Sequence, residues 1–228
     1  MGFIVKNTTI KNPLDLICPH TCIGCEAVGK VLCECCKNNI LDDHLNYCPN
    51  CKRLTPDGDC KNCALPPCFM VGWRDELVFK LVEEFKYHSV RALGEELADL
   101  LDGVLPEVAG EVVVVPLPTI RSHVRERGFD HMLKIAKSLA KKRGWKVERI
   151  LKRAKNTVQV GANREVRLVQ AAGAYELAGT ISPDKTYLVL DDVWTTGASM
   201  KIVTKKLQRA GALKVLLAVL AVNRGNPQ

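Results

Sequence analysis

Eight cysteines form four pairs with the spacing C-x-x-C, and all 11 cysteines of the 228-residue chain lie between Cys18 and Cys68. A C-x-x-C turn presents two sulfurs on the same side, and four thiolates complete the tetrahedral shell of a structural zinc ion. In a reducing compartment this spacing favours metal binding over disulfides. The simplest prediction is two successive zinc sites, with the ligands Cys22, Cys25, Cys33 and Cys36 in the first and Cys48, Cys51, Cys60 and Cys63 in the second.

The spacing does not fix which pairs share a metal ion, so an interleaved arrangement of the first and third pairs stays open. Cys35 is an alternative ligand to Cys33, and Cys18 and Cys68 are surplus. A segment of about 50 residues with few large apolar side chains cannot fold by burial alone. We therefore expect metal binding to supply much of its folding free energy, and expect chelation to unfold this segment by itself.

A second candidate site follows an apolar stretch near the C-terminus. Leu188–Leu190 is expected to be a buried strand that delivers Asp191 and Asp192 at its tip. Backbone N–H groups at the start of a helix, helped by hydroxyls and a glycine, can hold phosphate, and the two carboxylates can accept hydrogen bonds from ribose hydroxyls. The segment is neither a Walker loop nor a G-x-G-x-x-G turn. The residues predicted to hold phosphate are Thr195, Thr196, Gly197, Ala198 and Ser199.

Basic residues gather after another predicted strand, the β-branched run Val112–Val115. Between Thr119 and Arg167 there are 15 Lys and Arg against four Asp and Glu, which favours contact with polyanions. The lysines at 137, 141 and 142 are typical of the solvated face of a helix. The stretch directly after the strand contains the candidate anion-binding residues Pro116, Leu117, Pro118, Arg121, Arg125 and Arg127.

The elements that carry these residues alternate between helix and strand. Apolar residues at spacings of three to four predict the helices, and short apolar runs predict buried strands. This alternation predicts an α/β fold, a parallel sheet with helices on both faces and functional residues after the strands. The expected helices are 74–88, 90–103, 130–143 and 198–210, and the expected strands are 112–115, 187–190 and 214–222.

Charge divides the chain where the cysteines end. Residues 1–68 carry no net charge, so residues 69–228 carry the whole formal charge of +8. We predict a cysteine-rich domain at 1–68 and an α/β domain at 69–228. The longest apolar run, Val215–Val222, is far shorter than the ~20 residues of a membrane span. The N-terminal sequence lacks the apolar segment and cleavage site of a signal peptide, so a cytoplasmic location is expected.

The segment 188–199 resembles the 5-phosphoribosyl 1-pyrophosphate (PRPP) signature of type I phosphoribosyltransferases, three apolar residues followed by D-D-x-x-T-T-G-x-S. Val115–Pro118 and Arg127–Phe129 resemble V-P-x-P and R-G-F-N-Q of the competence protein F (ComF) family, which is amidophosphoribosyltransferase-like and has an N-terminal double zinc ribbon. The resemblance spans about residues 14–223. The segment from Arg153 to Tyr175 resembles that family's variable hood.

Four positions depart from the family pattern. Asp130 and His131 replace Asn-Gln, Gln170 replaces an Asn, and Trp194 is bulky for its place in the loop. The resemblance implies that PRPP binds with Mg²⁺ at the acidic segment, and that the loop after V-P-x-P contacts pyrophosphate. Turnover would transfer the phosphoribosyl group to a nucleobase-like or amine acceptor, although no catalytic residue is evident.

A second hypothesis from the same resemblance is a non-catalytic, PRPP-regulated protein that handles single-stranded DNA during DNA uptake, with competence-machinery proteins as partners. The basic segment favours binding of DNA. The aromatic content is only 5%, however, so the chain has few side chains on which DNA bases could stack. His123 and His131 have no partner carboxylate visible in the sequence, so they are expected to be phosphate-side or surface histidines. Phe85-Lys86-Tyr87 resembles a family motif but is expected to serve helix packing.

Overall fold

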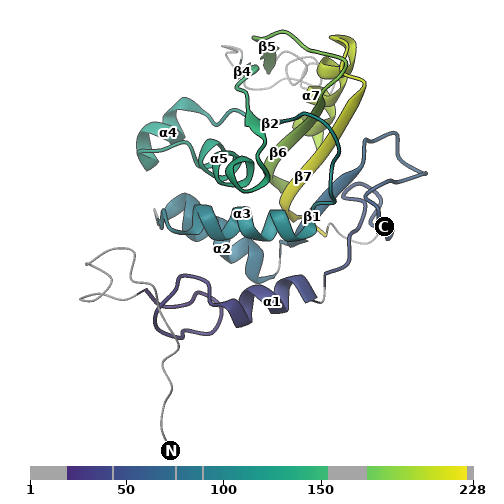
Figure 1. Ribbon diagram of the computed structural model, residues 1–228. Coiled ribbons are helices and arrows are strands. Elements are labelled where there is room, and N and C mark those ends of the chain that lie inside the picture. Colours follow the sequence, from purple (N-terminus) through teal and green to yellow (C-terminus); the bar gives the residue numbers. More distant parts are fainter. Residues whose placement is uncertain (1–19, 43, 75, 89, 154–173, 225–228) are drawn as a thin grey trace, which may run out of the picture.

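The computed structural model describes residues 20–42, 44–74, 76–88, 90–153 and 174–224 (Figure 1). Its centre is a five-stranded sheet in which every neighbouring pair is parallel. The central strands contain apolar runs, as is typical of strands that are buried on both faces. In spatial order the strands are β1 (Cys68–Trp73), β7 (Lys214–Val222), β6 (Thr186–Trp194), β2 (Val112–Pro116) and β3 (Lys146–Val147).

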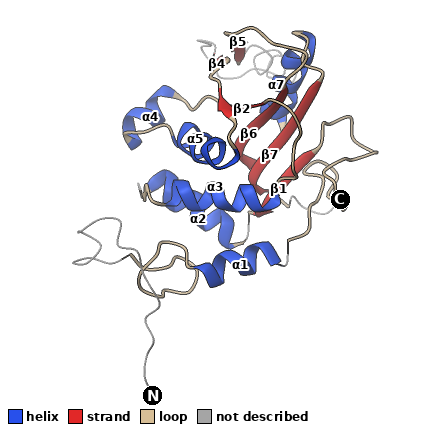
Figure 2. Ribbon diagram, in the orientation of Figure 1, coloured by secondary structure: helices blue, strands red, loops and turns tan. Residues whose placement is uncertain are grey.

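Helices cover both faces of this sheet, as predicted (Figure 2). One face packs against α2 (Leu77–Tyr87), α3 (Leu93–Val104) and α5 (His131–Arg143), whose apolar residues share a core with Val112 and Val114. The other face packs against α7 (Ala198–Arg209), whose core includes Val113 and Val115. Alternate residues of β2 thus point to opposite faces of the sheet. The helices on both faces therefore pack against β2 and fix the position of the residues that follow it.

Several elements were not predicted from the sequence, and two of them matter for the site. No strand is predicted at residues 68–73, yet the register of β1 with β7 makes it an edge strand of the parallel sheet, and it begins at Cys68, the last residue of the predicted cysteine-rich domain. The arginines after β2 were expected in a loop, and instead form the short helix α4 (Arg121–Arg127), which ends at Gly128 with φ of 73°. No residue of α4 is buried, so hydrophobic periodicity gave no signal for it.

A small antiparallel pair lies apart from the main sheet, formed by β4 (Leu151–Arg153) and β5 (Tyr175–Leu177). These strands are the two ends of the predicted hood. Gln170 and the rest of the hood between them lie outside the described residues.

The cysteine-rich segment packs closely on the α/β part. Its helix α1 (Glu34–Asp42) follows Val31 and Leu32, which are buried in the same apolar core as α2 and α3. Lys37 adds ion pairs to Glu96 at 2.5 Å and to Asp99 at 2.8 Å. The division at residue 68 stays a prediction, but the two parts share one core. Within the described ranges, no helix is long and apolar enough to cross a membrane.

Candidate functional site

The eight cysteines of the C-x-x-C pairs form two separate groups. Within each group all four sulfur atoms lie within 4.8 Å of one another. Four thiolates around zinc, with Zn–S bonds of about 2.3 Å, stand about 3.8 Å apart, so each group fits a tetrahedral ion. The groups are Cys22, Cys25, Cys33 and Cys36, and Cys48, Cys51, Cys60 and Cys63.

This grouping matches the successive arrangement and not the interleaved one. Cys35 is exposed and belongs to neither group. Within the first group, the backbone N–H of Cys33 donates to the sulfur of Cys22, and that of Cys36 donates to the sulfur of Cys33. Cys68 is buried in β1, and Cys18 lies outside the described residues.

The acidic pair lies inside β6 rather than at its tip. The sequence suggested that the strand stops at Leu190, but β6 continues through Asp191 and Asp192 to Trp194. The strand extends because β7 has nine residues and pairs with β6 as far as Trp194 and Val222. Successive side chains of a strand point to opposite faces of the sheet, so the two acids at the carboxyl end of β6 have different surroundings.

Asp192 is held by two side chains from other helices. Its Oδ2 accepts from Lys86 Nζ on α2 at 2.7 Å and from His131 Nε2 on α5 at 2.6 Å. Burial raises the pKa of Asp192, but the hydrogen bond from His131 and the charge of Lys86 outweigh burial and lower this pKa below its usual range. Asp192 is therefore an ionised anchor that ties α2 and α5 to β6.

The contacts of His131 define its proton positions. Its Nδ1 lies 3.2 Å from Nη1 of Arg127, and a guanidinium can only donate. Nδ1 is thus the acceptor, and the proton of the neutral ring sits on Nε2, from which it is donated to Asp192. The alternative of a surface histidine was wrong for His131, which is buried and bonded to Asp192, a carboxylate too distant in sequence for the pattern to reveal.

Asp191 has a different environment. Its Oδ1 accepts from the backbone N–H of Asp192 at 3.0 Å. Burial, followed by the negative charge of Asp192, raises the pKa of Asp191 well above its usual range. The two neighbouring acids therefore differ in charge state, with Asp192 ionised and Asp191 inclined to hold a proton.

The loop between β6 and α7 exposes Thr195 and Thr196 at its turn. Gly197 follows with φ of 70°, and a Cβ at this position would come within 2.0 Å of the Trp194 ring. Trp194 is bulky for this position but buried, because its ring packs directly beneath Gly197. The loop therefore needs glycine for its backbone conformation and for its close contact with Trp194. After Ala198, the Ser199 Oγ accepts from the Tyr175 hydroxyl of β5 at 3.1 Å.

A pocket of about 240 Å³ brings together part of each predicted anion-binding segment. The acidic segment and its loop contribute Asp191, Asp192 and Ser199, while the stretch after β2 contributes Leu117, Pro118 and Arg127. Residues outside the predicted site complete the lining, together with the two histidines expected to be phosphate-side or surface residues: Lys86, Tyr87, Thr119, Ile120, His123, His131, Met132, Arg153 and Tyr175.

Several predicted residues lie near this pocket without lining it. Pro116 is buried at the end of β2, and Arg121 and Arg125 are exposed on α4. The residues Thr195, Thr196, Gly197 and Ala198 form the turn beside Ser199, outside the lining set. The candidate PRPP and pyrophosphate residues therefore stay predictions as ligand contacts.

The motif Phe85-Lys86-Tyr87 combines packing with a place in the site. Phe85 is fully buried, as the helix-packing interpretation required. Lys86 instead reaches Asp192, and Tyr87 lines the pocket with the Arg127 guanidinium 5.2 Å from its ring centre. The signal for these roles was present in the family motif, but helical periodicity explains only Phe85.

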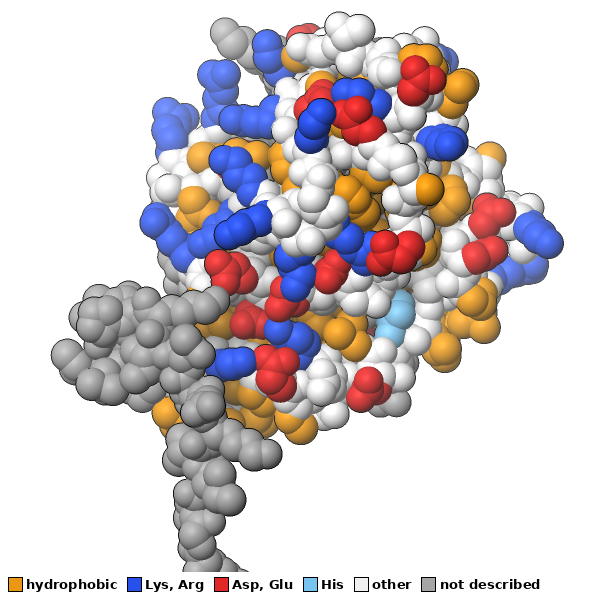
Figure 3. Space-filling model, viewed as in Figure 1, with side chains coloured by type: hydrophobic (Ala, Val, Ile, Leu, Met, Phe, Trp, Pro, Cys, Tyr) orange, Lys and Arg blue, Asp and Glu red, His pale blue; other side chains and the backbone are white. Residues whose placement is uncertain are grey.

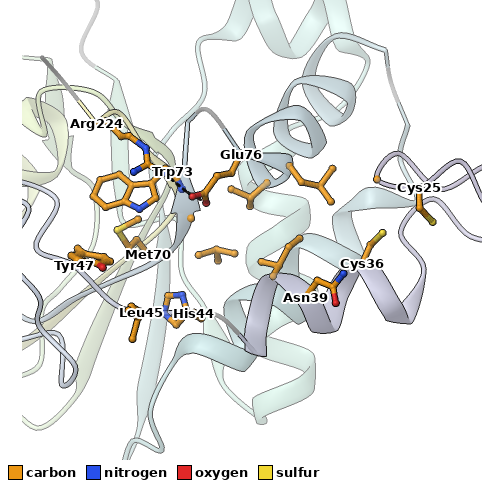
Figure 4. A pocket seen from close by; sticks show the side chains of 16 residues that line it. Cys25, Cys36, Asn39, His44, Leu45, Tyr47, Met70, Trp73, Glu76 and Arg224 are labelled. Atoms are coloured by element: carbon orange, nitrogen blue, oxygen red, sulfur yellow. Dashed lines mark hydrogen bonds and ion pairs between the residues drawn. The ribbon is translucent and has the colours of Figure 1, made fainter.

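A larger cavity of about 700 Å³ lies between the first cysteine group, β1 and the start of α2 (Figure 4). Apolar and aromatic side chains such as Tyr47, Met70 and Trp73 line much of it. Its cation, Arg224, pairs with Glu76 at 2.9 Å. The chemistry suited to phosphate therefore gathers in the smaller pocket.

Part of the basic excess is neutralised within the fold. Lys142 pairs with Asp99 at 2.7 Å, and Arg143 contacts Asp102 and two backbone carbonyls between α3 and β2. Lys137 and Lys141 are exposed on α5, as predicted. Figure 3 shows Lys and Arg side chains gathered on the upper left of the molecule, the side where α4 and α5 lie in Figure 1. The exposed charge lies beside the pocket.

No family model matches the chain. Two curated proteins are similar to it over most of their lengths. Competence protein ComFC of Streptococcus pneumoniae is 26% identical over 192 residues, covering 81% of this chain and 84% of that protein. Competence protein F of Haemophilus influenzae is 24% identical over 220 residues, covering 88% of this chain and 89% of that protein.

Similar solved structures include phosphoribosyltransferases. Glutamine PRPP amidotransferase from B. subtilis, complexed with ADP and GMP, matches with a TM-score of 0.44 and 17% identity, over 60% of this chain and 30% of that chain. A hypoxanthine phosphoribosyltransferase from Staphylococcus aureus matches with a TM-score of 0.33 and 14% identity, over 65% of this chain and 64% of that chain. The two curated competence proteins confirm the resemblance to the ComF family over most of the chain, which folds as a parallel α/β sheet preceded by two four-cysteine groups.

Proposed function

We propose that the chain binds PRPP with Mg²⁺ in the pocket at the end of β6, and that each four-cysteine group holds one structural zinc ion. The observation that carries the PRPP proposal is the meeting of Asp191, Ser199 in the first turn of α7, and Arg127 around one pocket. A carboxyl group, a helix N-terminus and a guanidinium suit the ribose, phosphate and pyrophosphate parts of one ligand.

The proposed ligand contacts follow from the geometry of the pocket. Asp191 faces the pocket, and within the part of the chain that the structure describes no cationic side chain is bonded to it, so its carboxyl group is available for ribose hydroxyls. The backbone of 195–199 would take a phosphate at the start of α7. Arg127 would take pyrophosphate beside Leu117 and Pro118, with Arg121 and Arg125 adding charge from the same helix.

Phosphoribosyl transfer would need little else from the protein. The reaction develops positive charge at the ribose and negative charge on the departing pyrophosphate, so positioning and charge neutralisation supply most of the catalysis. Mg²⁺, when bound with PRPP, would neutralise pyrophosphate charge. Lys86 and His131 fix Asp192, and so hold the strand that carries Asp191 in register. The same pocket would equally serve a protein that senses PRPP without turnover.

A second candidate function is PRPP-regulated handling of single-stranded DNA. It is favoured by the exposed Arg121 and Arg125 on α4 and the exposed Lys137 and Lys141 on α5, a basic surface beside the pocket. The similar proteins are named competence proteins, so DNA uptake and competence-machinery partners belong to this proposal. A cytoplasmic location, where PRPP and reduced thiols occur together, belongs to both candidates.

The two functions can be separated with Arg127→Ala and Lys141→Ala. Because Arg127 lines the pocket and Lys141 is exposed on α5, we expect only Arg127→Ala to weaken binding of Mg-PRPP measured by calorimetry. DNA held along a basic surface should lose affinity in both variants, and each lost phosphate contact should lower the salt slope by about 0.7 for a single strand. Unchanged PRPP affinity in Arg127→Ala would contradict the pocket assignment, and unchanged DNA binding in both would contradict the second candidate.

A further inference from the structure

The second cysteine group lies close to the loop that starts α7. Asn50, which stands between Cys48 and Cys51, donates from Nδ2 to the sulfur of Cys63 at 3.3 Å. Its Oδ1 accepts from Lys201 Nζ at 2.6 Å. A lysine ammonium can only donate, so the amide orientation is fixed, with the oxygen toward Lys201 and the nitrogen toward the sulfur. One asparagine therefore joins a metal-binding group to the first turn of α7.

Lys201 continues this connection to the loop itself. Its Nζ lies 5.8 Å from the centre of a Trp194 ring, and that ring packs beneath Gly197. Lys201 also follows Ser199 by two residues, so its position affects the first helical turn directly. The amide, the ammonium and the indole thus form one line of contacts from Cys63 to Gly197.

A second line of contacts reaches Trp194 from the same cysteine group. Lys52, which follows Cys51, donates to the carbonyl of Asn223 at 2.7 Å. The backbone N–H of Asn223 in turn donates to the carbonyl of Trp194 at 2.9 Å. Trp194 is therefore held through its ring by Lys201 and through its backbone by Asn223. Both lines start within one or two residues of a predicted metal ligand.

We propose that the second four-cysteine group braces the phosphate loop, with Asn50 and Lys201 as positioning residues, so that metal bound there raises the affinity of the loop for a phosphoribosyl ligand. The proposal rests on the proposed function for the identity of the ligand. The physical reason is that zinc fixes Cys63 and hence the Asn50 amide, which fixes Lys201 and the Trp194 ring. A loop that is already ordered loses less conformational entropy when phosphate binds.

The first test measures the loop without any ligand. Asn50→Ala and Lys201→Ala should speed amide hydrogen exchange at residues 195–200 in the zinc-loaded chain. The matched controls are Asn38→Ala on α1 and Lys205→Ala on α7, both exposed positions, which should leave this exchange unchanged. If both Asn50→Ala and Lys201→Ala fold with wild-type loop exchange, the brace does not exist.

The second test measures coupling in both directions. Asn50→Ala and Lys201→Ala should each weaken Mg-PRPP about threefold to tenfold, the scale of one hydrogen bond, and the double variant should lose no more than the larger single loss. In the wild-type chain Mg-PRPP should slow zinc loss to a chelator from the second group, and this slowing should shrink in Asn50→Ala. Zinc loss that does not respond to bound Mg-PRPP would overturn the proposal.

The two tests also separate this proposal from the proposed function. If the wild-type chain fails to bind Mg-PRPP while Asn50→Ala still speeds loop exchange, the ligand assignment is wrong and the brace stands. If Mg-PRPP binds the wild-type chain and the Asn50 and Lys201 variants equally well, the ligand assignment stands and the brace is wrong.

Discussion

Asp191 and Asp192 are adjacent in sequence, yet they have different roles in the structure. Lys86 and His131 both bind the same oxygen of Asp192, which makes this acid an internal anchor. Asp191 accepts a hydrogen bond from the backbone N–H of its neighbour, and it lines the pocket. The sequence motif treats the two acids as equivalent, and the tertiary contacts of Lys86 and His131 distinguish them.

This difference predicts a pH dependence for the free energy of unfolding. The pKa of Asp191 is raised to about 8, so the folded protein binds more protons than the unfolded chain above the ordinary carboxyl range. The stability that Asp191 contributes to the fold is therefore present at low pH and is lost as pH rises from about 4 toward the pKa of Asp191 in the folded protein. In Asp191→Asn the free energy of unfolding should no longer fall with rising pH for this reason. Denaturant unfolding of both proteins between about pH 5 and pH 8 would measure the difference.

Two comparisons sharpen this prediction. Asp184→Asn, at an exposed position, should keep the wild-type slope. Asp192→Asn should destabilise the fold near neutral pH, because the lowered pKa of Asp192 gives stability that is present above the ordinary carboxyl range and lost as pH falls. Identical pH slopes in the wild-type chain and Asp191→Asn would contradict the assigned protonation of Asp191.

At the scale of elements, sequence patterns located every long helix and the central strands. Apolar periodicity and β-branched runs suffice where an element buries one or both faces, as in α3 and β2. They failed for α4, which buries nothing, and for β1, whose strand pairing with β7 is a contact between distant segments. The sequence motifs identified the acidic segment. The contact between Lys86 and Asp192 could not be predicted from them, because it depends on how α2 packs against the sheet.

The junction of β6 and α7 gives a prediction about Gly197. An alanine there would have a left-handed backbone, at a cost of about 1–2 kcal/mol, and its Cβ would collide with the Trp194 ring. Gly197→Ala should therefore lower thermal stability and displace the loop, with loss of Mg-PRPP binding in calorimetry. Adding Trp194→Leu should recover part of the stability, because the smaller side chain removes the collision but not the backbone strain.

A matched control lies at another turn. Gly144 has φ of 66° and no atom within 4 Å of an added Cβ, so Gly144→Ala should cost only the backbone strain. If Gly197→Ala and Gly144→Ala are equally destabilising, and Trp194→Leu restores nothing, the packing of Trp194 under the loop is not as described.

On the scale of the whole molecule, the cysteine-rich segment is part of the α/β core. Val31 and Leu32 pack in the same core as Leu97 and Leu101, and Lys37 pairs across the boundary with α3. The sequence suggested a segment that unfolds by itself, because charge and cysteine content change sharply at residue 68. Composition records such a change, but it does not reveal apolar contacts between the parts.

Metal removal tests this shared core. Metal analysis should find about two zinc ions per chain, because each four-cysteine group fits one tetrahedral ion. Chelation should lower the melting temperature of the α/β part as well, which tryptophan fluorescence and circular dichroism can follow together. One zinc ion per chain, or an α/β part whose melting temperature ignores chelation, would contradict this description.

The central claim is that the pocket at the end of β6 binds PRPP, and calorimetric titration of the zinc-loaded chain with Mg-PRPP tests it most directly. We predict saturable binding of one PRPP per chain. Asp191→Ala should weaken this binding by about 0.5–1.5 kcal/mol, the scale of a hydrogen bond between neutral groups. Absence of saturable binding by the wild-type chain, or equal affinity in Asp191→Ala, would contradict the claim.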